Sequence, residues 1–133
     1  MPERNVAVMD PSDIPLFALA DRRLSWIDAR QAVLAQNVAN SDTPGWRSRD
    51  LKPFAATLGA AGIGLAQTDP GHLAGTAGGA YAAVAQTGER APDGNGVALD
   101  QELVKVADTD AAHELVNNVT RKYLGMFRLA IGR

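Results

Sequence analysis

Near the start of the chain, apolar residues recur at alternating spacings of three and four, which is the period of an amphipathic helix. Residues 11–15 place prolines, a serine and an aspartate where a helix can begin, so we expect a helix over residues 14–40. At about 1.5 Å per residue it would be about 40 Å long, more like a rod than an element of a compact domain. Its stripe has the period of a coiled-coil seam, is interrupted by Gln31, and consists of Phe17, Ala20, Leu24, Ile27, Leu34 and Val38.

A second apolar stripe appears only in the last third of the chain. The turn signal of residues 93–96 precedes a helix that we expect over about residues 100–131, with acidic residues in its first half and most of its basic residues near its end. That polarity complements the helix dipole. Because an amphipathic helix must bury its stripe, we expect the two terminal helices to pack together. The second stripe drifts past Asp110 and Asn117, and contains Leu99, Leu103, Val106, Leu115, Val119, Tyr123, Met126, Phe127, Ala130 and Ile131.

The first helix should end at the polar segment of residues 40–45. Pro44 with its fixed φ, followed by Gly45, which is free to take positive φ, predicts a type II turn. Residues 46–54 then alternate apolar and charged side chains, which indicates an extended segment lying against a helix. This motif can be a helix cap with an apolar anchor. Trp46, a large side chain in a chain with few aromatics, favours a turn that takes part in an interface.

The middle of the chain has a different composition. Ten of the 13 glycines lie in residues 55–96, together with twelve alanines, so little burial would repay the entropy of ordering this segment. We expect a flexible insertion with at most short β pieces near residues 65–73 and 81–86. The organisation is therefore one mainly α domain, with an N-terminal part (residues 1–54), the insertion (residues 55–96) and a C-terminal helix (residues 97–133).

Composition and charge narrow the function. Only 5% of residues are aromatic, and the 46% apolar fraction is rich in alanine, so burial should come from long interfaces. A net charge of -2 gives no basic footprint for nucleic acid. Without cysteine, and with His72 and His113 far from any ligand cluster, we expect no metal site, no cofactor and no catalytic centre. We also expect no cleaved signal peptide and no membrane span.

Three groups of residues carry a family resemblance. The first closes the predicted first helix, the second is Arg49-Asp50 followed by Phe54, and the third is Asp93-Gly94-Asn95 with Val97 and then Glu102. On these residues the chain resembles the flagellar basal body rod proteins of the rod, hook and hook-associated axial family. Trp46 stands where that family usually has tyrosine, and Gly125 where it more often has a better helix former. The first group is Ala35, Asn37, Ala39, Asn40, Asp42, Thr43, Pro44 and Gly45.

The resemblance implies a structural subunit of the proximal rod, which transmits torque and has no active site. It implies export by the flagellar type III apparatus without a cleaved signal, assembly in the periplasm, and contacts with copies of the chain, with the rod proteins FlgC, FlgF and FlgG, with FliE and with the MS-ring protein FliF. The motif residues would be Asn37, Asn40, Asp42, Thr43, Pro44, Gly45, Trp46, Arg49 and Asp50, and the two apolar stripes would form the assembly interface. Two alternatives stay open: a subunit of the FlgC group, against which Arg49-Asp50 and residues 93–97 argue, and a secreted helical adaptor protein.

Overall fold

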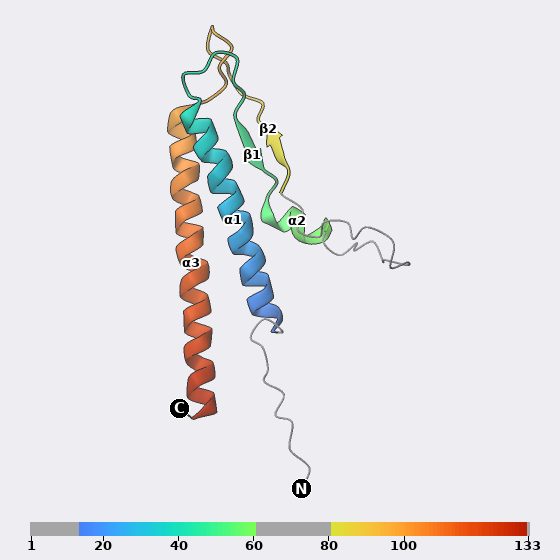
Figure 1. Ribbon diagram of the computed structural model, residues 1–133, viewed down its shortest axis with the longest axis vertical. Coiled ribbons are helices and arrows are strands. Elements are labelled where there is room, and N and C mark those ends of the chain that lie inside the picture. Colours follow the sequence, from blue (N-terminus) through green and yellow to red (C-terminus); the bar gives the residue numbers. More distant parts are fainter. Residues whose placement is uncertain (1–13, 61–80, 133) are drawn as a thin grey trace, which may run out of the picture.

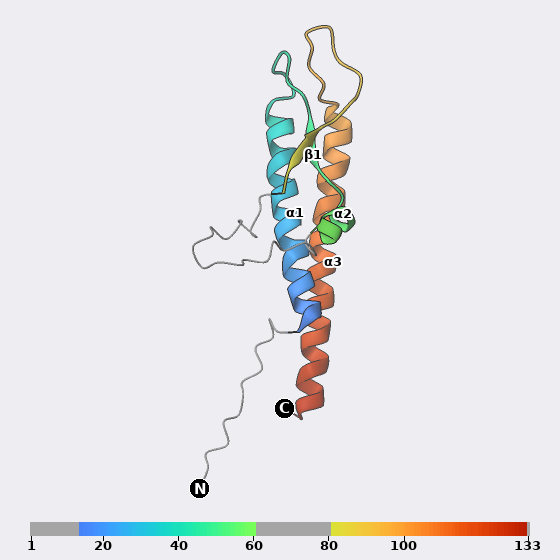
Figure 2. The same ribbon diagram turned by 90° about the vertical axis from the view of Figure 1, so that its right-hand side faces the viewer.

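Two long antiparallel helices lie side by side and carry a small two-stranded antiparallel sheet on one flank, as Figures 1 and 2 show. The computed structural model describes residues 14–60 and 81–132. The mainly α architecture with paired terminal helices is confirmed. The elements in chain order are α1 (Pro15–Ala39), β1 (Arg49–Leu51), α2 (Phe54–Ala60), β2 (Ala83–Ala85) and α3 (Leu99–Ile131).

Both ends of α1 follow from local chemistry. Pro15 occupies the first turn, where its missing N–H costs nothing. At the other end the Asn40 side chain donates a hydrogen bond to the Gln36 carbonyl (2.8 Å). Gly45 has a φ of 74°, and the Trp46 N–H donates to the Thr43 carbonyl (3.2 Å), as the predicted type II turn requires.

At 33 residues, α3 is longer than the 25-residue α1. Its carboxyl end reaches past the start of α1 in both views (Figures 1 and 2). It stops at Gly132, whose φ of 78° is the left-handed conformation in which glycine commonly ends helices. The last turns of α3 therefore extend beyond α1, and Phe127 there packs on Phe17, with 6.1 Å between the ring centres.

The buried core is small and is centred on α1. Ile27 and Leu34 are completely buried, and Phe17 is nearly so, so this part of the α1 stripe faces inward as expected. Trp26 is buried on the adjacent side of α1, against Leu51 of β1. The helix pair and the two-stranded sheet thus share one thin core.

On α3 most of the predicted stripe is exposed within the single molecule. The side chains buried on this helix are those of Glu102 and Thr109, and Val116 is half-buried. The spacing of apolar residues alone does not distinguish a helix face that packs within the molecule from one that remains exposed to solvent. Among the residues of the predicted stripe, Val106 is half-buried, whereas Leu99, Leu103, Leu115, Val119, Tyr123, Phe127 and Ile131 are exposed.

The extended segment after the turn and the β piece near residues 81–86 are confirmed as an antiparallel pair. Arg49 lies opposite Ala85 and Leu51 opposite Ala83. The short helix α2 was not expected, because the composition of residues 55–96 predicts a flexible insertion with at most short β pieces. Pro53 precedes it, and its carbonyl accepts the Ala56 N–H (2.9 Å), so alanine's helix propensity prevails locally. The β piece expected near residues 65–73 lies outside the described residues.

The different environments of two leucines give a direct test. Leu34→Ala should lower the free energy of unfolding by about 2–4 kcal/mol, since Leu34 is 0% exposed and its loss leaves a cavity. The same change at Leu115, which is 63% exposed, should cost less than about 0.5 kcal/mol. Urea unfolding of the isolated chain, followed by circular dichroism, measures both. Equal losses would mean that Leu115 is packed inside the free molecule.

Candidate functional site

The turn after α1 is held by Asn95, which lies in the segment just before α3. The Asn95 side-chain amide lies 3.1 Å from the carbonyl oxygen of Asn40 and 2.8 Å from those of Ser41 and Thr43. Its side-chain oxygen accepts the N–H of Val97 (2.7 Å). Carbonyl groups at the end of a helix have no hydrogen-bond donors within the helix. The Asn95 side chain, which is 5% exposed, supplies these donors from more than 50 residues away in the sequence.

Backbone contacts join the same two segments. The Gly45 N–H donates to the Asp93 carbonyl (3.1 Å), and the Gly96 N–H donates to the Trp46 carbonyl (2.9 Å). Gly94 has a φ of 83°, and a Cβ at this position would lie 3.5 Å from the Gly45 Cα. The turn after α1 and the lead into α3, which the sequence presented as separate motifs, are therefore one structural site at the end of the helix pair.

A buried polar cluster connects both helices to β1. The Asn37 amide group donates to the Glu102 carboxylate (2.8 Å) and to the Arg49 carbonyl, while its oxygen accepts the Arg49 N–H (3.0 Å). Glu102 is 2% exposed and also accepts a hydrogen bond from Lys105 (2.8 Å). A buried carboxylate without these donors would be strongly unfavourable, so the cluster is satisfied only when the two helices stand in this register.

A second charged cluster holds β1 against α1. The Arg30 guanidinium makes two hydrogen bonds of 2.9 Å to the Asp50 carboxylate, which also accepts the Leu51 N–H. Arg30 and Arg23 lie over the Trp26 ring, at 5.4 Å and 4.6 Å from its centre. Burial alone would raise the pKa of Asp50, but the hydrogen bonds and charge of Arg30 outweigh it, and the pKa lies below its ordinary value.

The predicted motif residues thus divide into two groups. Residues 40–46 meet residues 93–97, whereas Asn37, Arg49 and Asp50 lie in or beside the two charged or polar clusters. Asp42 and Pro44 are exposed in the turn. Trp46 is half-buried and its side-chain N–H has no hydrogen-bond partner in the described residues, so its role as an interface anchor stays a prediction.

Sequence analysis missed four residues that hold this arrangement. Asn95 and Glu102 were noted only as part of a family pattern, and Trp26 and Arg30 were not singled out. Trp26 lies one position before a stripe residue, so a search for one apolar face passed over it. The glycines on either side of Asn95 were the signal that the backbone there approaches another segment closely.

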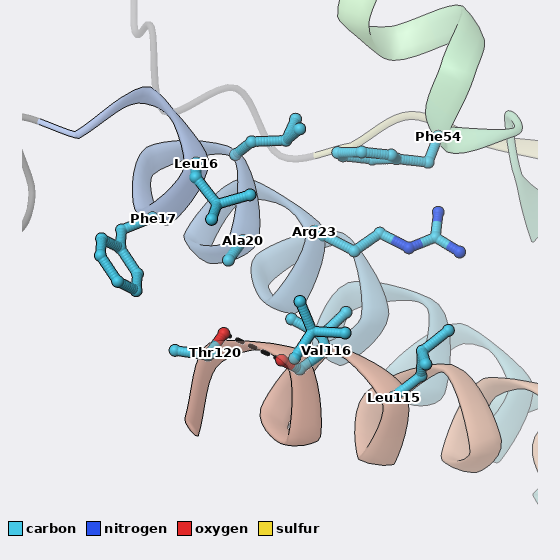
Figure 3. A pocket seen from close by; sticks show the side chains of 10 residues that line it. Leu16, Phe17, Ala20, Arg23, Phe54, Leu115, Val116 and Thr120 are labelled. Carbon is cyan, nitrogen blue, oxygen red and sulfur yellow. Dashed lines mark hydrogen bonds between the residues drawn. The ribbon is translucent and has the colours of Figure 1, made fainter. Parts of the chain in front are cut away.

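An apolar groove opens on the flank of the helix pair where α2 begins (Figure 3). It is open to solvent and has a volume of about 310 Å³. Arg23 is the charged residue of its lining, and the dashed line in Figure 3 marks the bond from the Thr120 hydroxyl to the Val116 carbonyl (2.8 Å). The groove is lined by Leu16, Phe17, Leu19, Ala20, Arg23, Phe54, Leu115, Val116, Val119 and Thr120.

Residues 14–60 and 81–132 contain no cluster of histidine, aspartate or glutamate side chains able to hold a metal ion. His113 lies beside Asn117, one helical turn along α3. No helix in these residues is long and apolar enough to cross a membrane. What the described structure offers is packing surface and hydrogen-bonded junctions between elements.

Comparison with known proteins identifies the class. The flagella basal body rod protein family matches residues 20–47, which cover most of α1 and the turn that follows it. The relatives include FlgB of Agrobacterium fabrum, 30% identical over 90% of this chain and 95% of its own. FlgB of Proteus mirabilis (strain HI4320) is 34% identical over 74% of this chain and 80% of its own, and FlgB of Escherichia coli (strain K12) is 33% identical over 65% and 70%.

The paired terminal helices and the family match define a flagellar basal body rod protein. More specifically, the chain belongs to the FlgB family. The FlgC alternative is not favoured, and neither is the adaptor.

The amide of Asn95 can be tested by an almost isosteric change. Asn95→Asp removes the donors and places a carboxylate against three carbonyls, so we expect a loss of about 2–4 kcal/mol of unfolding free energy. The matched control is Asn118→Asp, since Asn118 is exposed and its oxygen already accepts from Arg121 (2.7 Å). Urea unfolding monitored by circular dichroism compares the two variants. If both behave alike, Asn95 does not hold the turn.

The Arg30–Asp50 pair predicts a pH dependence. The folded-state pKa of Asp50 lies below its unfolded value of about 3.9, so the stabilisation is fully present above about pH 5 and is lost as pH falls through the folded-state pKa. Asp50→Asn should cost about 2 kcal/mol near pH 7, because Arg30 loses a carboxylate that is 9% exposed. The gap between wild type and variant should narrow in acid. A gap that stays constant from about pH 7 to pH 2 would contradict this assignment.

Proposed function

We propose that this chain is a structural subunit of the proximal rod in the bacterial flagellar basal body. Copies stack into a helical shaft that transmits torque from the motor ring to the distal rod and hook. The subunit acts by packing and carries out no chemical reaction. Membership of the FlgB family supports this proposal.

The observation that carries the proposal is the exposed apolar surface of α3. Leu115 and Tyr123 are exposed, Phe127 is exposed on the side away from its contact with Phe17, and the last turn adds Leu129 and Ile131. A contiguous apolar patch on a free molecule usually marks an interaction surface. At about 25 cal/mol per Å² of apolar area, covering several such side chains stabilises an assembly by many kcal/mol before ordering costs are subtracted.

The polarity of the inner face points the same way. The side of α3 that meets α1 buries Glu102 and Thr109 beside the half-buried Val116 and the Phe127 ring. By contrast, Leu103, Val104 and Leu115 are more than half exposed. A helix selected only to pair with α1 would have the reverse pattern. We therefore assign the exposed part of the predicted α3 stripe to contacts between molecules.

The proposed partners are copies of the chain, the rod proteins FlgC, FlgF and FlgG, the adaptor FliE and the MS-ring protein FliF. The route is export through the flagellar type III apparatus, without a cleaved signal, to the periplasmic part of the basal body. Contacts that repeat head to tail without closing form a helical array, which is the symmetry of a shaft. An adaptor that bound one target would form a discrete complex instead.

A charge on the exposed stripe separates assembly from folding. Leu115→Asp should leave the unfolding free energy of the isolated chain within about 0.5 kcal/mol, since Leu115 is exposed, yet abolish motility because a carboxylate would be buried between subunits. Ala82→Asp, on an exposed residue before β2, is the control and should leave motility intact. Swimming in soft agar and the amount of the chain in purified basal bodies measure the effect. Normal motility of the Leu115 variant would exclude this face from the assembly.

A further inference from the structure

The apolar groove is built from three elements and is left unfilled by the residues that the structure describes. Leu19 comes from α1, Phe54 from the start of α2, and Leu115 with Val119 from α3. Figure 3 shows Leu16 and Phe54 on one side and Leu115 and Val116 on the other, with Arg23 between them.

Arg23 gives the groove a charge preference. Its guanidinium lies 4.6 Å from the centre of the Trp26 ring and 4.8 Å from that of Phe54, so aromatic faces hold it in place. Within residues 14–60 and 81–132, no carboxylate lies within 4 Å of its guanidinium. Burial and the charge of Arg30 lower the pKa of Arg23, which an added anion would reverse.

The first turns of α3 present a complementary surface. Leu103 and Val104 are 53% and 61% exposed, and Leu99 is also exposed. Leu99 and Leu103 form one column at a spacing of four, and Asp100 and Val104 form the next, so the exposed Asp100 lies inside an apolar patch. This surface offers three aliphatic side chains that fit an apolar groove and a carboxylate that can pair with Arg23.

We infer that the groove of one copy receives the first turns of α3 from a second copy, with Leu99, Leu103 and Val104 against its apolar walls and Asp100 beside Arg23. This inference rests on the proposed rod function and gives it a specific contact. The two surfaces lie at different levels of α3, roughly 20 Å apart along the helix at 1.5 Å per residue. A contact between different levels is head to tail, so it adds copies along an axis and does not close a pair.

Because the chain contains no cysteine, crosslinking can test this contact without background. Leu19→Cys and Val104→Cys would be made in two differently tagged full-length copies, produced together in the flagellated source bacterium lacking its own gene. A short bis-maleimide applied to purified basal bodies should join the two tags. The joined product should be absent when either cysteine is omitted.

Charge variants make the test specific. Asp100→Arg should lower the crosslink yield by at least about tenfold, since it sets two cations against each other, and adding Arg23→Glu should restore most of it. Asp108→Arg and Arg22→Glu are the matched controls, because both residues are exposed and outside the proposed contact, and each should leave the yield unchanged. Because Asp100 lies in the first turn of α3, circular dichroism of the purified variant should show unchanged helix content before its yield is interpreted.

Each other outcome overturns the inference. A crosslink from Leu19→Cys to a different protein in place of the second copy would give the groove another occupant. If the double charge exchange did not rescue the crosslink yield, or if the control variants lost as much yield, the inferred contact between Arg23 and Asp100 would be contradicted. If the chain is present in basal bodies but never crosslinks, the groove contact fails while the rod function stands. Absence of the chain from basal bodies would instead refute the proposed function itself.

Discussion

α3 carries more apolar surface than α1 can cover. The shorter helix leaves the last turns of α3 beyond its own end, and the small two-stranded sheet packs mainly on α1. Burial in water stabilises a helix only on the side that has a partner, so much of α3 gains nothing within the single molecule. The thin core, the open groove and the exposed stripe all follow from this imbalance, as does the need for neighbours.

With so little core, polar contacts specify how the elements fit. A stripe of aliphatic residues tolerates slipping of one helix along another, because one leucine can replace the next. The Asn37–Glu102 hydrogen bond does not tolerate such slipping, since a shift of one turn would separate the buried Glu102 carboxylate from the Asn37 amide. Asn95 does the same for the turn, whose carbonyls it can reach from only one position. Hydrophobic burial holds the helices together, and these amides set their register.

Periodicity predicted both long helices to within a residue or two, because their stripes and their proline and glycine signals are local. The turn at Pro44 and Gly45 was equally readable. The sequence did not predict which face of α3 meets α1, since a 3.6-residue period indicates a helix and does not identify its partner. The cluster around Asn95 joins residues more than 50 positions apart, and α2 depends on the short-range propensity of a few alanines within a glycine-rich stretch. Those features arise only when the chain is folded.

A polar seam also suits a subunit that has to travel before it assembles. In the proposed export route the chain is moved before it assembles, and a helix pair that opens at a modest cost suits such a step. The α1–α3 seam buries Glu102 and Thr109 where leucines would have made a more stable pair, and buried ionic groups add specificity more readily than stability. The apolar residues that would make the free molecule rigid are instead kept on the outer face of α3. Their burial is then gained at the growing end of the shaft, where the subunit becomes fixed only after its neighbours are in place.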